Sequence, residues 1–323
     1  MRMKRKIMGI SIVLIILALV IVGLSLSFTS KEKTKAVKIG YLPIMASLSL
    51  YIAQENNYFT EQGIQVETIQ LQSSNQLVDA LVRGDIDVVV ESSAVPALIA
   101  ETIDSGKIKI FSVSDITPET PLDSLIVEKV SGLNSLRNLE RKRIGVFPGS
   151  TATNLLKKFL SDKNIDVSKI EFIQIIPPNQ LPALYEGSID VLHAYEPTTT
   201  IALQSGKARK LYGSAYAEQL NHNPQGVALI SSKFMSENPK LAKKTIKAFD
   251  QASDFISQND DKTREIVVKY VKVDKNIADN VVFLYMSRSD RINRNALQTY
   301  ADMLYDIGEM KSKIDASTIL YAS

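Results

Sequence analysis

The stretch Ala-Leu-Val-Arg-Gly-Asp-Ile-Asp at residues 80–87 returns as Ala-Leu-Tyr-Glu-Gly-Ser-Ile-Asp at residues 183–190. A second matched pair lies upstream of these, with Ile-Gly-Tyr-Leu-Pro at residues 39–43 and Ile-Gly-Val-Phe-Pro at residues 144–148. The offset of roughly a hundred residues is too long for solenoid units of about 20–50 residues, and it suits two similar globular lobes. A cleft between two such lobes is a typical place for a small-molecule site.

Composition excludes several classes of protein. The 323 residues are 45% apolar and 23% charged, which is typical of a globular chain large enough for more than one domain. The formal net charge is +3, and residues 1–35 carry +6 of it, so the rest of the chain is −3. An acidic body offers no footprint for nucleic acid, and we expect no such partner. The chain has no cysteine and two histidines, so we expect no disulfide, no metal site and no cofactor.

Residues 1–35 resemble a membrane signal. A basic start is followed by an apolar run over residues 7–28, which has the length of a spanning helix (about 20 residues) rather than that of a signal core (about 7–15). We expect an uncleaved anchor and a polar tether, and a cleaved signal stays open because small residues lie near the end of the run. Basic residues ahead of the run place the body on the extracytoplasmic face of the cell membrane, or make it secreted or periplasmic after cleavage.

Strand-like and helix-like segments alternate along the body. Strands are predicted at residues 37–41, 64–71, 86–90, 108–113, 143–147, 170–176 and 189–193. Helices are predicted at residues 47–56, 75–83, 94–103, 151–160, 179–186, 241–257, 266–270 and 296–307. This alternation predicts an α/β fold with two lobes, each a mainly parallel sheet flanked by helices.

Two short apolar segments suggest how the lobes are connected. Leu125–Val127 leaves the first lobe and Val227–Ile230 returns to it, which indicates a hinge of two crossings. The predicted division is therefore as follows: signal or anchor with tether 1–35, first part of lobe 1 36–123, lobe 2 124–226, and completion of lobe 1 with C-terminal helices 227–323.

Together these segments resemble the substrate-binding proteins of ABC importers, in the sulfonate, nitrate, taurine and thiamin-precursor group with the type II periplasmic-binding fold. The resemblance covers about residues 36 to 320, and it rests on residues 39–43, 80–87, 142–150, 183–190, 196–197 and 237–248. It implies a small-molecule ligand caught by hinge closure and delivery to ABC permease subunits, and we expect a monomer. Many secreted relatives carry a lipid-attachment cysteine, which this chain lacks.

Ligands of open α/β sheets bind beyond the carboxyl ends of the strands, and this rule selects loops in both lobes. The candidate ligand-binding residues are Tyr41, Pro43, Ser47, Ser73, Ser74, Glu91 and Ser92 in lobe 1, and Gly149, Ser150, Thr151, Asn179, His193, Tyr195 and Glu196 in lobe 2. No arginine or lysine lies in these loops.

The candidates favour two different ligand chemistries. Residues 149–151 open a helix whose free N–H groups suit a sulfonate, phosphate or carboxylate, although ordinary capping by their hydroxyls explains the same residues. Glu91 and Glu196 instead favour a cation or a donor such as an amino-pyrimidine. A solvated turn before Pro197 explains Glu196 equally well.

Aromatic and imidazole side chains complete the candidate set. Tyr41 and Tyr195 are placed to stack on a flat ligand or simply to pack. His193 has no serine, cysteine or metal-ligand cluster to complete a catalytic arrangement, so no catalytic residue is assigned. We therefore expect a binding protein, not an enzyme.

The leading hypothesis is the binding component of an ABC importer for a small organic solute of the sulfonate, nitrate or taurine type. The alternative ligand is a thiamin-precursor pyrimidine. A remote alternative is an enzyme, because the resemblance extends to a fold branch that makes such a pyrimidine from its own histidine; the membrane signal argues against it. A membrane sensor needs an intracellular output domain, and only about six residues precede the apolar run.

Overall fold

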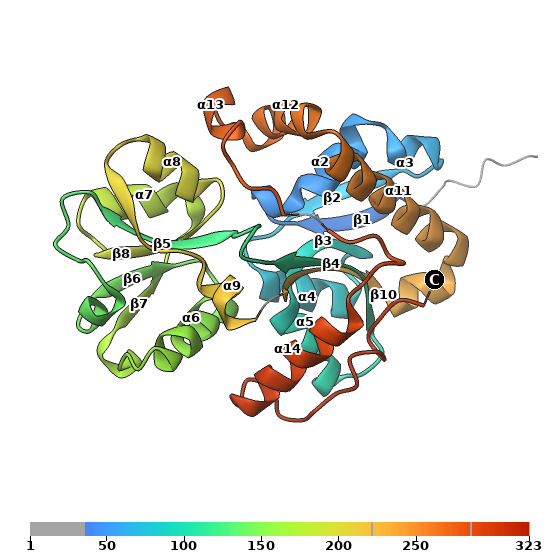
Figure 1. The fold of residues 1–323 in the computed structure, drawn as a ribbon. Helices are drawn as coiled ribbons and strands as arrows, with labels where there is room; N and C mark the ends of the chain where they lie inside the picture. The colour runs from blue at the N-terminus through green and yellow to red at the C-terminus, as the bar shows by residue number, and fades with distance from the viewer. Residues whose placement is uncertain (1–35, 221, 285, 323) are drawn as a thin grey trace, which may run out of the picture. The chain divides into compact units, whose positions relative to one another are not determined.

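Two β-sheets organise the body of the chain (Figure 1). The computed structural model describes residues 36–220, 222–284 and 286–322. The predicted anchor and tether over residues 1–35 lie outside these residues. Within the described part, no helix has both the length and the apolar character that crossing a membrane requires.

Lobe 1 is built on the first sheet, which has five strands in the described residues, in the order β2-β1-β3-β10-β4. They are β1 (Val37–Tyr41), β2 (Val66–Gln70), β3 (Val88–Ser93), β4 (Ile108–Ile116) and β10 (Asn223–Ser231). β1 pairs in parallel with β2 and β3, whereas β10 is antiparallel to both β3 and β4.

Lobe 2 is built on the second sheet, which also has five described strands, in the order β7-β6-β8-β5-β9. They are β5 (Asp123–Glu128), β6 (Arg143–Val146), β7 (Glu171–Gln174), β8 (Val191–Tyr195) and β9 (Ala208–Tyr212). β6 is parallel to β7 and β8, and β5 is antiparallel to β8 and β9. The two sheets thus share one topology, as the repeated sequence predicts.

Each sheet is mixed, whereas the sequence predicted mainly parallel sheets. The parallel strands of each lobe end at the other lobe, so a strand that enters from the other lobe must run the opposite way. β5 enters lobe 2 directly after β4, and β10 re-enters lobe 1 after α9 (Ala215–Gln219). The predicted crossing segments are therefore strands of the sheets, and the crossings fall just before β5 and β10. The predicted domain boundaries stay predictions, and the one at residue 226 lies inside β10.

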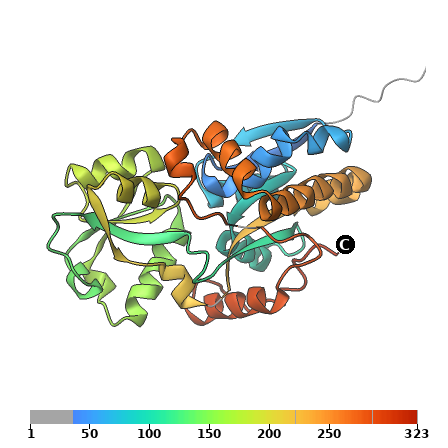
Figure 2. The same cartoon turned by 45° about the horizontal axis from the view of Figure 1, so that its top comes forward.

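Helices cover both faces of each sheet (Figure 2). Lobe 1 has the 3₁₀ turn η1 (Met45–Ser47) and the helices α2 (Leu48–Glu55), α3 (Tyr58–Glu61), α4 (Ser74–Arg83), α5 (Ala94–Ile103), α10 (Ser232–Glu237), α11 (Pro239–Gln258), α12 (Asp260–Val271), α13 (Lys275–Ala278) and α14 (Arg294–Asp306). Lobe 2 has η2 (Leu136–Leu139), α6 (Ser150–Asp162), η3 (Val167–Lys169), α7 (Pro177–Tyr185), α8 (Thr198–Gln204) and α9.

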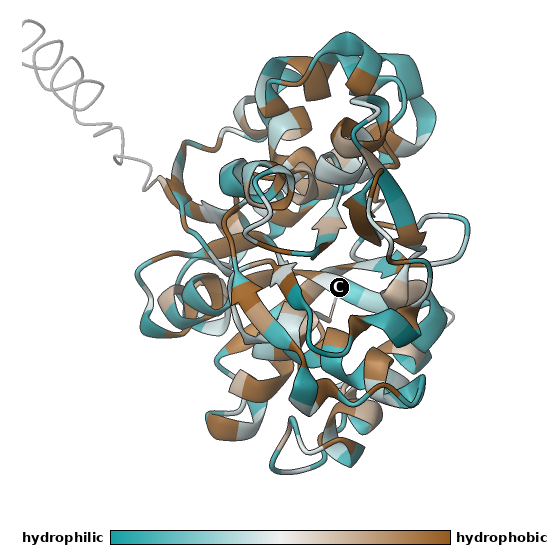
Figure 3. Cartoon of the chain, turned by 90° about the vertical axis from the view of Figure 1, so that its left-hand side faces the viewer, coloured by the Kyte–Doolittle hydropathy of each residue, from teal (hydrophilic) through white to brown (hydrophobic). Residues whose placement is uncertain are grey.

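The strand pattern explains why helices cover both faces. Val88 and Val90 of β3 face the cluster that includes α2 and α11, and Val89 between them faces the cluster that includes α4, α5 and α14. All three side chains are fully buried. A run of β-branched residues is expected in a strand with two buried faces. Figure 3 shows the complementary pattern on the helices, which carry both apolar and polar residues.

The repeated motifs pack on each other in the same way in both lobes. A Cβ added at Gly40 of β1 would lie 2.5 Å from Cδ1 of Ile86, and one added at Gly145 of β6 would lie 2.6 Å from Cδ1 of Ile189. Each isoleucine comes from the repeated motif, so each glycine leaves room for the motif of its own lobe. This contact explains why the two pairs of motifs occur together.

The aspartates that end the motif secure the same strands. Asp87 Oδ2 accepts a hydrogen bond of 2.9 Å from the backbone N–H of Lys38, at the start of β1. Asp190 Oδ2 accepts one of 2.8 Å from the backbone N–H of Arg143, at the start of β6. Burial raises the pKa of Asp190, but the hydrogen bonds and charge of Arg143 outweigh it and lower the pKa overall.

Candidate ligand-binding site

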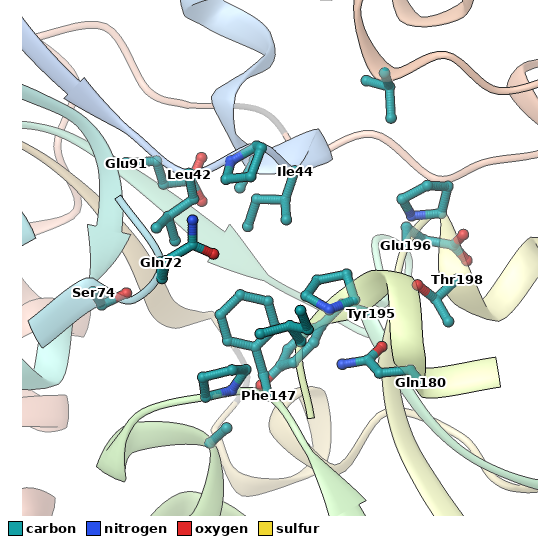
Figure 4. A pocket seen from close by; sticks show the side chains of 18 of the residues that line it. Leu42, Ile44, Gln72, Ser74, Glu91, Phe147, Gln180, Tyr195, Glu196 and Thr198 are labelled. Carbon is teal, nitrogen blue, oxygen red and sulfur yellow. The ribbon is translucent and has the colours of Figure 1, made fainter. Parts of the chain in front are cut away.

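A cavity of about 610 Å³ lies between the two lobes, at the carboxyl ends of their parallel strands. In Figure 4, one side is formed by lobe 1 residues, with labels on Leu42, Ile44, Gln72, Ser74 and Glu91. The facing side is formed by lobe 2 residues, with labels on Phe147, Gln180, Tyr195, Glu196 and Thr198. Strand ends of the two lobes therefore share one hollow, where the strand-end rule places the site.

Some of the predicted site residues line this cavity and others do not. Those that line it are Pro43, Ser74, Glu91, Ser92, Tyr195 and Glu196. Those that do not are Tyr41, Ser47, Ser73, Gly149, Ser150, Asn179 and His193. The side chain of Thr151 lies outside the described part of the structure. The second group has structural roles next to the cavity wall, as follows.

In lobe 1, three predicted residues support the loops that line the cavity. Ser47 is fully buried, and its Oγ donates a 2.7 Å hydrogen bond to the carbonyl of Leu42. Ser73 caps α4, since its Oγ accepts from the backbone N–H of Gln76 at 3.3 Å. Tyr41 lies with its ring edge-to-face on Tyr51, 6.3 Å between centroids.

In lobe 2, the predicted anion-binding helix end lies beside the cavity. Gly149 is the N-cap of α6, and its N–H donates to Oε1 of Gln174 at 3.0 Å. Ser150 Oγ accepts a 3.4 Å hydrogen bond from Nδ2 of Asn75, which joins the two lobes. Thr151 follows in the first turn of α6, where Ala152 is the residue that lines the cavity.

His193 lies beneath the cavity. Its side chain is fully buried, with Nε2 2.9 Å from Oδ2 of Asp123. The imidazole packs against the rings of Tyr195 and Tyr216, each 5.2 Å away between centroids. The pair supports Tyr195, which does line the cavity and whose hydroxyl lies 2.7 Å from that of Tyr216.

Glu91 is the most deeply buried ionisable group of the cavity wall, with 6% of the residue exposed. It lies on β3, and Ser114 Oγ on β4 donates a 3.1 Å hydrogen bond to its Oε1. Burial raises the pKa of Glu91 to about 8, and the Ser114 hydrogen bond offsets part of the rise. Gly226 on β10 makes room for this pair, because a Cβ there would overlap both the carboxyl and the Ser114 hydroxyl.

The N-termini of α7 and α8, which line the cavity in lobe 2, are poor anion sites. α7 starts with Pro177 and Pro178, which have no N–H to offer, and Asn179 gives its own N–H to the carbonyl of Ile176 at 3.0 Å. α8 starts beside Glu196, whose Oε2 accepts the N–H of Thr200 at 3.3 Å. Burial raises the pKa of Glu196, which is 9% exposed, so the solvated-turn interpretation is wrong.

Sequence reasoning missed the contribution of the C-terminal helices. The cavity is lined by Val271, the last residue of α12, and by Lys272 and Val273, which follow it before α13. Lys272 is the one basic side chain among the described lining residues, although the strand-end loops contain none. Its backbone is left-handed, with φ of 59°. The sequence carries no motif there that signals a site.

Gln225 of β10 was also missed, and it forms part of the cavity floor in lobe 1. Its Nε2 donates to Ser93 Oγ at 3.2 Å, and its Oε1 accepts from the hydroxyl of Tyr300 at 3.1 Å. Within the described residues, no cluster of histidine, aspartate and glutamate is arranged to hold a metal ion.

The two lobes with a cavity between them form the two-lobed type II periplasmic-binding fold. The NMT1-like family model matches residues 30–272, so the chain belongs to the NMT1-like family. A Bacillus subtilis protein, provisionally named an aliphatic sulfonates-binding protein, is 24% identical over 298 residues, which cover 90% of this chain and 86% of that protein.

Solved structures support the fold assignment. The alkanesulfonate-binding protein SsuA from Xanthomonas axonopodis pv. citri, bound to MOPS, superposes with a TM-score of 0.73 at 19% identity, over 89% of this chain and 98% of that one. The desulfurization enzyme DSZB has a TM-score of 0.64 at 15% identity, over 88% and 96% of the two chains. The same fold therefore serves both a binding protein and an enzyme, and function must be argued from the site.

Proposed function

We propose that the protein is the extracytoplasmic substrate-binding component of an ABC importer, which captures a small organic solute and delivers it to the permease subunits. The observation that carries the proposal is the cavity between the lobes, which strand ends from both of them line. A ligand that contacts both walls binds the closed arrangement better than an open one. It therefore shifts the equilibrium towards closure.

Organic sulfonates are the leading class of ligand within the sulfonate, nitrate and taurine group. The names of the Bacillus and Xanthomonas proteins support this choice. The cavity of about 610 Å³ has apolar walls that include Leu42, Phe147 and Ile176, which favour an organic body over a bare inorganic anion. Lys272 supplies a positive charge for the sulfonate end.

A thiamin-precursor pyrimidine is the second candidate ligand, and a specific feature favours it. Glu91 offers a carboxyl to ring or amino nitrogens from the lobe 1 wall, and on the lobe 2 wall the rings of Phe147 and Tyr195 stand edge-to-face, 5.9 Å between centroids. A flat heteroaromatic ligand matches such a wall.

The remaining parts of the proposal concern location and turnover. Residues 7–28 anchor the body to the extracytoplasmic face of the membrane, and the protein acts as a monomer beside its permease. It binds its solute without converting it. The catalytic alternative, a pyrimidine-synthesising enzyme of related fold, has little support in the cavity, since His193 is buried against Asp123.

A thermal-shift screen of the full chain tests the proposal. The compounds are taurine, alkanesulfonates, nitrate and aminopyrimidines. A true ligand raises the melting temperature in a concentration-dependent way, because binding at 100 times Kd stabilises the folded state by about 2.7 kcal/mol. Chemical conversion of the compound, or no stabilisation by any of them, would contradict the proposal.

A further inference from the structure

We propose that Glu91 selects the ligand by pairing its carboxylate with a protonated nitrogen or amino group of the solute at the lobe 1 wall. The inference rests on the proposed function and narrows its ligand class to nitrogen-bearing organic solutes, such as aminosulfonates.

Within the described part of the chain, Glu91 has no cationic partner that would stabilise its carboxylate form. Ser114 donates to Oε1, and among the described residues no hydrogen bond reaches Oε2. No charged group of these residues contributes to the shift in the pKa of Glu91, and Gly226 of β10 leaves the space that its carboxyl occupies. Buried carboxylates normally pair with a cation or with several donors. Glu91 has neither in the part of the protein that the structure describes, and a ligand with a cationic nitrogen or N–H donors would supply the missing partner.

The Glu91 carboxyl occupies a built position. Gly226 is shaped to it, because any side chain there would overlap both Glu91 and Ser114. The residue is 6% exposed and lies within β3, the central strand of the lobe 1 sheet, where packing fixes its direction. A chance surface carboxylate has neither property.

Carboxyl groups outnumber basic groups in the described cavity lining. Glu91 and Glu196 face a single basic residue, Lys272, which is exposed, in the described lining. Two of the first residues of α7 are prolines, which have no backbone N–H to donate to an anion. A purely anionic ligand pairs only with Lys272 and leaves Glu91 in its neutral form, whereas a zwitterion pairs its ammonium group with the Glu91 carboxylate and its anionic end with Lys272.

Ionising Glu91 is not prohibitive. Burial raises its pKa to about 8, so Glu91 must lose its proton at pH 7 before it can pair with an ammonium group. This deprotonation lowers the affinity by only about tenfold. A charge-assisted hydrogen bond in a desolvated site outweighs a loss of this size. Lys272, the charged residue in the same wall, does not contribute to this shift in pKa.

The test uses isosteric ligand pairs and the full chain. 3-Aminopropane-1-sulfonate and butane-1-sulfonate differ only by ammonium in place of methyl, and 4-aminopyrimidine and 4-methylpyrimidine form the corresponding aromatic pair. Calorimetry should give the wild-type protein a Kd at least about tenfold lower for the nitrogen-bearing member of the pair that binds. Glu91→Gln, which keeps the shape and an acceptor for Ser114, should reduce that preference to threefold or less.

A matched control and a second readout separate specificity from folding. Glu101→Gln changes a carboxyl that is also buried in lobe 1, 4% exposed, but outside the cavity, and should keep the preference. Binding of 3-aminopropane-1-sulfonate at pH 7 should release roughly one proton from the wild type and none from Glu91→Gln, measured in buffers of different ionisation enthalpy.

Three results decide the matter. Loss of the preference in Glu91→Gln, with retention in Glu101→Gln, supports the inference. Preference for the methyl member, or a preference that survives Glu91→Gln, overturns it and leaves the proposed function standing. Failure of all four compounds to bind overturns the proposed function and this inference with it.

Discussion

Gln204 of α8 in lobe 2 and Asn276 of α13 in lobe 1 exchange two hydrogen bonds across the cleft. Asn276 Nδ2 donates to Gln204 Oε1 at 2.7 Å, and Gln204 Nε2 donates to the carbonyl of Asn276 at 3.3 Å. Asn276 lies three residues after Val273 in the sequence, and Val271–Val273 line the cavity. Figures 1 and 2 both place α13 beside lobe 2. Opening of the cleft along this edge must break both bonds.

Asn276→Ala should therefore weaken ligand binding. Exposed neutral hydrogen bonds contribute about 0.5–1.5 kcal/mol each, so Kd should rise by about two- to tenfold for any ligand that requires closure. Calorimetry measures the change. Asn295→Ala is the matched control, because Asn295 is an exposed residue in the first turn of α14, away from the Gln204–Asn276 pair, and its Kd should stay within twofold. Equal effects of the two substitutions would refute a role in closure.

Gly226→Ala should destabilise the fold and impair binding together. The added methyl would overlap Ser114 Oγ and the Glu91 carboxyl in a buried strand, and overpacking of this kind costs about 1–3 kcal/mol. Urea denaturation measures the loss in free energy of unfolding. Gly213→Ala, where no atom lies within 4 Å of the new methyl, should be close to neutral. A neutral Gly226→Ala would mean that Glu91 is not held as described.

The stability difference between Glu91→Gln and the wild type should depend on pH. The folded state holds the Glu91 proton up to about pH 8, whereas the unfolded chain releases it near its ordinary pKa of 4.5. Between these values the folded state binds more protons, so this residue makes stability fall as pH rises. The slope is at most about 1.4 kcal/mol per pH unit.

Urea denaturation at pH 5, 6, 7 and 8 follows this effect. The free energy of unfolding of Glu91→Gln, measured relative to that of the wild type, should rise steadily from pH 5 to pH 8. This difference should level off above pH 8. A difference that is independent of pH would show that Glu91 ionises in the folded state at its ordinary pKa.

Lys272→Met should weaken the binding of organic sulfonates selectively. The substitution removes the one basic side chain of the described cavity lining and keeps much of its apolar length, so Kd for sulfonates should rise by about tenfold. Lys275→Met, in the same segment but outside the lining, should change Kd by less than twofold. Equal Kd values for wild type and Lys272→Met would remove Lys272 from the proposed recognition of the sulfonate.

Local sequence signals predicted much of the fold because each has one physical cause. Gly84 and Gly187 end their helices with φ of 81° and 71°, a conformation that glycine adopts without strain. In each lobe, the isoleucine of the motif packs on the glycine of β1 or β6. The aspartate after it accepts a hydrogen bond from the backbone at the start of the same strand. The strand predicted at residues 86–90 is observed at Val88–Ser93.

Features that depend on distant parts of the chain could not be predicted. The antiparallel direction of β5 and β10 follows from the crossings between lobes, which leave no local pattern. The strand-end rule found Glu91 and Tyr195 at the cavity, but half-buried neighbours such as Tyr41 differ from them only by packing. Lys272 reaches the cavity from helices that the sequence identifies only as packing elements.

The most direct measurement is a calorimetric titration of the full chain with organic sulfonates, followed by recovery and NMR analysis of the compound. A receptor that shuts on its solute should bind one molecule per chain, saturate, and return the compound unchanged. Recovery of an altered compound, or the absence of saturable binding across the series, would contradict the account.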